Sequence, residues 1–229
     1  MTAIATAQTV DLAVSSLREL NQRLHDAGGG RWQIVNPNGA HAVACGLDGP
    51  FDVEILGHVG YYCAGMNQRA TVRVRGNAGT GVAENMMSGT IVVEGNASQS
   101  AGATGRGGLL VVHGDAAARC GISMKGVDIV VRGSVGHMSA FMAQRGCLVV
   151  CGDAGDALGD SIYETHVYVR GNVAGLGADC IEKELRDNHV AELRSLLERS
   201  GIDGDPAEFR RYGSARELYN FRINNAGAY

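Results

Sequence analysis

Aromatic residues, prolines and long hydrophobic runs are all scarce in this sequence. Phe, Trp and Tyr make up 5% of its 229 residues, and proline occurs three times. No stretch approaches the ~20 apolar residues of a transmembrane helix. The N-terminus has no basic start followed by an apolar run, so the sequence predicts no signal peptide. We therefore expect a cytoplasmic protein without a membrane segment.

The sequence also lacks a large net charge and cysteine pairs at the C-x-x-C spacing. The net charge of −4 gives no reason to expect nucleic acid or an anionic membrane as a partner. None of the cysteines forms a C-x-x-C pair, which indicates reduced thiols in a cytosolic protein. The six cysteines are Cys45, Cys63, Cys120, Cys147, Cys151 and Cys180.

Glycine is the abundant residue, and it recurs at a fixed interval. The 34 glycines are about twice the usual share of roughly 7%. They alternate with Val, Ile and Leu, which disordered chains lack. One glycine closes an aliphatic triplet every 19 residues, and such a period indicates a solenoid. These repeat glycines are Gly57, Gly76, Gly95, Gly114, Gly133, Gly152 and Gly171.

Two aliphatic positions precede each repeat glycine, at a spacing that predicts one inward face of a short strand. Four residues before the glycines stand Val53, Val72, Ile91, Leu110, Ile129, Leu148 and Val167. Two residues before them stand Ile55, Val74, Val93, Val112, Val131, Val150 and Val169. The position between these two columns varies from Glu54 to Tyr168, so we expect it to face solvent or a partner.

The positions after each repeat glycine predict turns. A polar residue, mostly Asn, Asp or Ser, follows directly, and the glycine itself tolerates positive φ. Seven residues after the glycines stand only Gly and Ala: Ala64, Ala83, Gly102, Gly121, Ala140, Gly159 and Ala178. We expect the chain to turn inward there, with no room for a larger side chain.

These columns predict a mainly β fold, a single-stranded right-handed parallel β-helix of about seven 19-residue coils with helical flanks. Stacked coils are expected about 4.8 Å apart. A left-handed hexapeptide helix is disfavoured, because 19 is not a multiple of six. We divide the chain into a lead-in with a helix (1–50), the β-helix (51–180), and a C-terminal helix with a tail (181–229).

Both flanking helices are predicted from apolar spacing, and both are expected to cap the solenoid ends. The first spans Val10 to Ala27 and stops at Gly28. The second runs through 179–200 and ends at Gly201. Its expected buried stripe consists of Ile181, Leu185, His189, Leu193 and Leu196.

No catalytic, cofactor-binding or metal-binding motif is found, so we predict no such residue on this chain. The glycines of 76–81 repeat in other coils, which favours a structural role over a nucleotide loop. Cys147 and Cys151 lie along one strand, too far apart to share an ion. The histidines are scattered, and we expect structural or surface roles. Four methionines near one edge predict an internal stack or a partner face: Met66, Met86, Met124 and Met142.

The repeated G-x-x-G units, such as "GHVGYYCAG" and "GDAGDALG", resemble the glycine-repeat (GXGXG) domain that closes the large subunit of glutamate synthase. The same module resembles the β-helical component of formylmethanofuran dehydrogenase. The resemblance covers roughly residues 40–180. With the tail "RRYGSARELYNFRINNAGAY", the chain most resembles the free-standing glutamate-synthase-like subunit of N-methylglutamate synthase, also called methylamine–glutamate N-methyltransferase.

The resemblance implies a non-catalytic assembly subunit within a hetero-oligomeric enzyme. It implies two partners, an amidotransferase-like subunit and an FMN subunit that carries an iron–sulfur cluster, with no cofactor on this chain. The implied reaction joins methylamine to a glutamate skeleton, giving N-methylglutamate and ammonia. The alternative is a β-helix subunit of a formyl-transferring complex in one-carbon metabolism. A polysaccharide-cleaving solenoid is disfavoured, because such an enzyme would need a secretion signal and clustered carboxylates, and the sequence shows neither.

The C-terminal tail concentrates aromatic residues and arginines, which often anchor protein interfaces. It is either a partner contact or a cap that folds back on the last coil. The candidate contact residues are Phe209, Arg211, Tyr212, Tyr219, Phe221, Arg222 and Tyr229.

Overall fold

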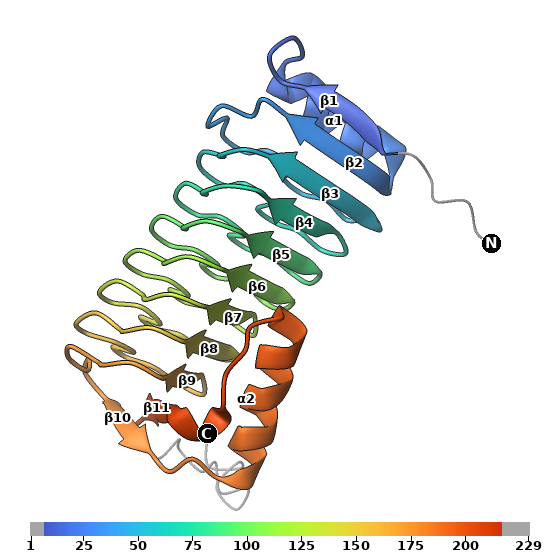
Figure 1. The fold of residues 1–229 in the computed structure, drawn as a ribbon. Helices are drawn as coiled ribbons and strands as arrows, with labels where there is room; N and C mark the ends of the chain where they lie inside the picture. The colour runs from blue at the N-terminus through green and yellow to red at the C-terminus, as the bar shows by residue number, and fades with distance from the viewer. Residues whose placement is uncertain (1–6, 217–229) are drawn as a thin grey trace, which may run out of the picture.

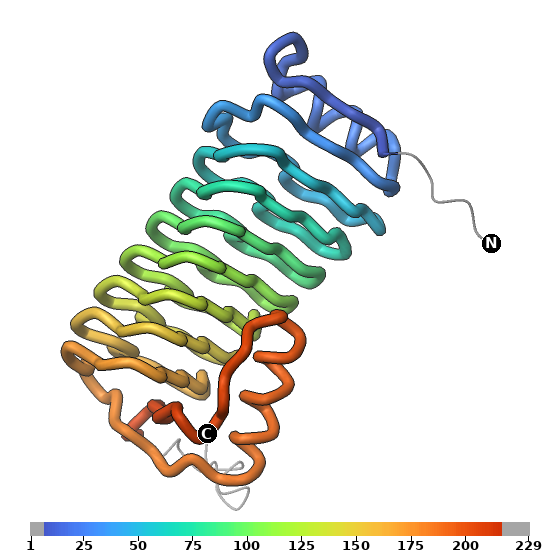
Figure 2. The backbone as a smooth tube through the Cα atoms, in the orientation of Figure 1, coloured from blue at the N-terminus to red at the C-terminus, as the bar shows by residue number. Residues whose placement is uncertain are grey.

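A computed structural model of the chain describes residues 7–216, which form an elongated stack of coils (Figures 1 and 2). Its single sheet has eleven strands in the order β1-β2-β3-β4-β5-β6-β7-β8-β9-β11-β10. Successive strands from β1 to β9 pair in parallel, whereas β11 pairs antiparallel with both β9 and β10. The sheet runs along one side of the stack, and the chain returns along the other side between strands.

Seven strands repeat at the predicted period of 19 residues and confirm the β-solenoid. They are β3 (Phe51–Leu56), β4 (Thr71–Val74), β5 (Thr90–Val93), β6 (Leu109–Val112), β7 (Asp128–Val131), β8 (Cys147–Val150) and β9 (His166–Val169). Val72 pairs with Ile91, and Leu148 pairs with Val167, so equivalent residues stack directly. The right hand of the coil stays a prediction, because strand pairing alone does not distinguish the two hands.

The interior of the stack is a continuous aliphatic column. All fourteen side chains of the two predicted inward columns, from Val53 to Val169, are fully buried. Buried aliphatic area is the main favourable term in folding, and each coil buries its face only against its neighbours. Two of the four methionines, Met86 and Met124, also lie inside, whereas Met66 and Met142 are exposed.

The repeat glycines are required by close packing, and only Gly57 among them has positive φ. A Cβ at any of the other six would lie 2.5–2.9 Å from a backbone atom of the glycine one coil earlier. The expectation of a positive-φ turn at these positions was therefore wrong. The coils approach so closely at this corner that no side chain fits.

The polar column after the repeat glycines forms a ladder between coils instead of bonding its own turn. Asn77 Oδ1 accepts from the Asn96 N–H at 2.8 Å, and Asn96 Oδ1 accepts from the Asp115 N–H at 2.9 Å. The same bond recurs from Asp153 to the N–H of Asn172 at 2.7 Å. From His58 to Asp153, each side chain of this column therefore accepts a hydrogen bond from a backbone N–H of the next coil.

The return side of each coil has an unusual backbone, with left-handed φ at every second residue. Tyr62, Ala64 and Met66 have φ of 58°, 53° and 57°, and the pattern repeats through the coil of Ala157, Gly159 and Ser161. The predicted small column occupies the middle, buried position of these triplets from Ala64 to Gly159. Small residues are therefore needed there for space, whereas the left-handed φ by itself is also adopted by the larger Tyr62 and Met66. At Ala178 the prediction was wrong, because this last member of the column is exposed and lacks the left-handed φ.

The N-terminal flank combines a strand with a shorter helix than predicted. Strand β1 (Gln8–Asp11) pairs in parallel with β2 (Gly30–Val35), and helix α1 (Leu17–Ala27) follows β1. A capping box between Ser16 and Glu19 starts α1, and Gly28 in the left-handed conformation ends it. Helix prediction from Val10 failed because an open edge of β2 was available for pairing.

The C-terminal flank also differs from the expectation. Residues Cys180–Lys183 form β10, and helix α2 spans Asp187–Ser200, followed by a 3-10 turn at Pro206–Glu208 and by β11 (Arg210–Ser214). Ile181 is exposed on β10, whereas His189, Leu193 and Leu196 are buried as predicted. The last parallel strand is covered by β11, and α2 lies along the side of the stack (Figure 1). The division of the chain at residues 50 and 180 remains an interpretation, since one sheet crosses both boundaries.

Candidate functional site

The outward face of the sheet has two different halves. Between β3 and β5 it carries charged pairs, such as Arg75 Nε with Glu54 Oε1 at 2.7 Å. From β5 to β9 it is mostly apolar, and it forms one buried cluster with residues of α2, Ile202 and Phe209. Its buried residues there are Val92, Leu109, Val111, Val130, Cys147, Val149, Cys151 and Tyr168, packed with Leu193, Leu196 and Leu197. The expectation that the position between the inward columns faces solvent or a partner was therefore wrong in this half, where that position is buried within the chain.

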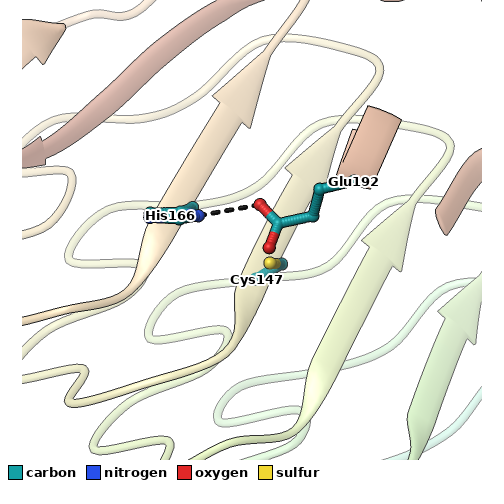
Figure 3. A group of neighbouring side chains, drawn as sticks. All are labelled: Cys147, His166 and Glu192. Atoms are coloured by element: carbon teal, nitrogen blue, oxygen red, sulfur yellow. Dashed lines mark hydrogen bonds and ion pairs between the residues drawn. The ribbon is translucent and has the colours of Figure 1, made fainter. Parts of the chain in front are cut away.

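A cluster of chemically active side chains lies where α2 crosses the first residues of β8 and β9. Cys147 begins β8, His166 begins β9, and the two pair directly across the sheet. Glu192 reaches them from the middle of α2 (Figure 3). One ligand-type atom from each of the three lies within 4.8 Å of the others.

The Glu192 carboxylate is the centre of this cluster. Its Oε2 lies 2.7 Å from His166 Nδ1 and accepts a hydrogen bond from the Tyr168 hydroxyl at 2.5 Å. The contact with His166, followed by that with Tyr168, lowers the pKa of Glu192 to about 2, although partial burial acts in the opposite direction. Glu192 is therefore ionised at neutral pH, and it ties α2 to β9.

The pKa of the Cys147 thiol is shifted in the opposite direction, upward. The thiol is buried, and burial raises its pKa, with further increases from the negative charges of Glu192 and Asp128. A nucleophilic cysteine needs a lowered pKa and a positive environment. The protonated Cys147 is therefore poorly suited to nucleophilic catalysis, although His166 is close to it.

Asp128 extends the cluster by one coil. It begins β7, and its pKa is raised by burial although Arg199 Nη1 lies 3.5 Å away. A cavity of about 440 Å³ opens beside these groups. Its lining residues are Gly126, Asp128, Arg145, Gly146, Cys147, Glu164, His166 and Glu192.

His189 supports the cluster from the first turn of α2. Its Nδ1 accepts a hydrogen bond from the Arg186 N–H at 3.1 Å, and its ring lies edge-on to that of His166, with centroids 5.2 Å apart. Burial lowers the pKa of His189, and the nearby Arg211 and His166 lower it further. A neutral His189 fits its role as a hydrogen-bond acceptor.

The candidate partner residues of the tail are only partly described. Phe209 and Tyr212 are buried within the chain, and the Arg170 guanidinium lies 5.9 Å from the Phe209 ring centroid. Arg211 Nε donates to the Glu184 carbonyl at 3.0 Å. This favours the cap over the partner contact for 209–214. Tyr219, Phe221, Arg222 and Tyr229 lie outside the described residues.

The sequence contains a periodic signal for the cluster, although none of these residues was predicted as a site. Asp128, Cys147 and His166 all stand five residues before a repeat glycine, so the period of 19 stacks them on consecutive coils. No short motif records this column, because its members lie 19 residues apart in the sequence. Glu192 carries no such signal, because α2 lies outside the repeat.

The fold and this cluster define a class of protein, a parallel β-solenoid with a helix fastened across part of its outer face. No protein-family profile matches the chain. Protein GlxC of Rhizobium meliloti (strain 1021) is 63% identical over 225 residues, which cover 96% of this chain and 99% of that protein. The chain belongs to the same family as Protein GlxC. Within residues 7–216, no helix has the length and apolar character needed to cross a membrane.

Proposed function

We propose that this chain is a non-catalytic assembly subunit of a glutamate-synthase-like enzyme of the N-methylglutamate synthase kind. In this proposal it bridges an amidotransferase-like subunit and an FMN subunit. Those two chains carry out ammonia transfer and the flavin chemistry, with an iron–sulfur cluster on the flavin subunit. The assembled enzyme would convert methylamine and glutamate to N-methylglutamate and ammonia.

The observation that carries this proposal is the solid, uninterrupted stack. Seven coils repeat without an insertion, and their interiors are filled by fully buried aliphatic side chains. A substrate that must be enclosed finds no space inside such a column. A rigid rod of this kind suits the positioning of other subunits, which is the role implied by the resemblance to the glutamate synthase glycine-repeat domain.

The cluster around Glu192 is consistent with a structural role. Cys147 is protonated and Glu192 is engaged by His166 and Tyr168, so neither is free to act as a nucleophile or base. Their contacts hold α2 on the stack. We therefore place catalysis on the partner chains.

Co-purification tests the proposal directly. The full chain with an affinity tag is expressed in its native host, and the captured proteins are identified by mass spectrometry and scanned for flavin absorbance. We expect an FMN protein and an amidotransferase-like chain in fixed ratio, with methylamine-dependent activity in the assembly. A metallohydrolase-like partner would instead support the formyl-transferring alternative. Flavin bound to the isolated chain would overturn the assembly role.

A further inference from the structure

The column of Asp128, Cys147 and His166 and the facing Glu192 have a chemistry that the assembly role does not use. The Cys147 sulfur, a His166 ring nitrogen and a Glu192 carboxylate oxygen lie within 4.8 Å of one another, on β8, β9 and α2. We propose that these three side chains bind one divalent transition-metal ion of the zinc class, which fastens α2 to the solenoid. The sequence analysis predicted no metal-binding residue on this chain.

Zinc binds all three of these ligand types. Thiolate, imidazole and carboxylate ligands lie about 2.0–2.3 Å from the ion, and in a tetrahedral site their atoms are then roughly 3.3–3.8 Å apart. The present separation of 2.7 Å between His166 Nδ1 and Glu192 Oε2 is slightly shorter. Ion binding therefore requires the Glu192 side chain to turn away from His166 by a fraction of an ångström to about one ångström. Figure 3 shows the carboxylate between the other two residues, with one oxygen toward His166 and the other toward the Cys147 sulfur.

The charges balance when an ion is present. A Cys147 thiolate and the Glu192 carboxylate together neutralise a divalent cation, so a buried thiolate is no longer isolated. Asp128 and Glu164 add negative charge around the cavity, whereas Arg145 and Arg199 act against a cation. The cavity of about 440 Å³ leaves room for a water molecule as a fourth ligand.

The surrounding contacts resemble those that support metal ligands in general. A ligating carboxylate is usually held by a further hydrogen bond, and Tyr168 supplies one to Glu192 Oε2. The His166 ring makes edge-on contacts with the rings of Tyr168 and His189, at centroid distances of 6.2 and 5.2 Å. These contacts therefore position the Glu192 and His166 side chains before an ion binds.

The test uses cobalt as a spectroscopic substitute for zinc. The full chain is stripped with a chelator and titrated with Co²⁺, and the near-ultraviolet thiolate-to-cobalt charge-transfer band is followed. We expect the band to saturate at one ion per chain and to disappear when Zn²⁺ is added. Cys147→Ser should lose it, and Cys151→Ser, a buried cysteine one residue past the other end of β8, should keep it.

Two further variants separate a metal site from a metal-free hydrogen-bonded cluster. Glu192→Gln removes a ligand and should weaken Zn²⁺ binding by roughly 100-fold or more, whereas Tyr168→Phe should weaken it by roughly 10–100-fold. Circular dichroism confirms that each variant is folded. A wild-type chain that shows no thiolate band, or a folded Cys147→Ser chain that retains it, overturns the proposal and leaves the cluster as a hydrogen-bonded contact only.

Discussion

At the residue scale, Gly121 shows how little space the return side of a coil leaves. Its φ is +69°, and a Cβ there would lie 3.0 Å from the Met124 sulfur and 3.3 Å from Ile129 Cδ1. A side chain at this position meets both a crowded core and an unfavourable backbone conformation.

We expect Gly121→Leu to lower the free energy of unfolding by about 2–5 kcal/mol, from overpacking together with left-handed strain. Arg75→Leu is the control. Arg75 is half exposed and contacts Glu54 and Glu94, so its loss should cost about 1 kcal/mol or less. Urea unfolding of both variants measures the difference, and equal losses would contradict the 19-residue alignment of the coils.

Glu192 predicts a pH dependence in metal-free protein. Its folded pKa of about 2 lies below the ordinary value of 4.5, so the folded state favours the ionised carboxylate. This stabilisation is fully present above about pH 4.5 and is lost as the pH falls toward 2.

Chelator-treated wild type should therefore exceed Glu192→Gln in stability at neutral pH and lose that advantage in acid. Because over a third of the side chain is exposed, we expect a pH-dependent part of roughly 1–2 kcal/mol. Denaturant unfolding of both chains across this pH range provides the measurement. A constant difference between them would show that the Glu192 charge does not contribute.

At the element scale, α2 converts part of an exposed sheet face into a second apolar core. Leu193, Leu196 and Leu197 pack on Val130, Val149 and their neighbours. The stack therefore has two apolar layers between β5 and β9, one inside the coils and one beneath the helix.

Leu193→Ala should lower the free energy of unfolding by about 2–5 kcal/mol, because it opens a cavity in this second layer. Arg194→Ala, at the adjacent exposed position of α2, should change it by less than about 0.5 kcal/mol. Hydrogen exchange of α2 and of β7 can be followed in the same samples. If Leu193→Ala behaved like Arg194→Ala, the helix would not be a stable part of the fold.

At the scale of the whole molecule, the C-terminal end of the stack is closed by a strand that runs antiparallel to the others. At the C-terminal end, β11 pairs with β9 and β10, and Tyr212 is buried. Exposed strand edges favour unwanted pairing between chains. The segment 209–214 therefore closes the last coil, whichever surface contacts a partner.

Truncation separates the cap from the rest of the tail. A chain that ends before Tyr212 loses most of β11 and should melt on the order of 10 °C lower, since burial of an aromatic residue contributes several kcal/mol. A chain that ends after Arg216 should keep the wild-type melting temperature. If that longer chain no longer captures its partners, residues 217–229 make the contact. Equal melting of the two truncated chains would contradict the capping role.

Much of the repeat could be predicted from the sequence. The period of 19, the two inward columns and the small column from Ala64 to Gly159 are local patterns, and stacking turns each of them directly into contacts between coils. The same period places Asp128, Cys147 and His166 in one column. Periodicity predicts such neighbours because each coil has the same shape.

Only the tertiary structure decided what covers the stack. Val10 pairs in β1 instead of continuing a helix because β2 offers an open edge, and Cys180–Lys183 form β10 because β11 returns beside them. Val92 and Val149 occupy outward positions of the repeat, yet both are buried in one cluster with residues of α2 and of the segment after it. Glu192 lies beside Cys147 and His166 because α2 packs against the sheet. These contacts join segments outside the repeat to segments within it, and no local spacing in the sequence records where a helix will be placed.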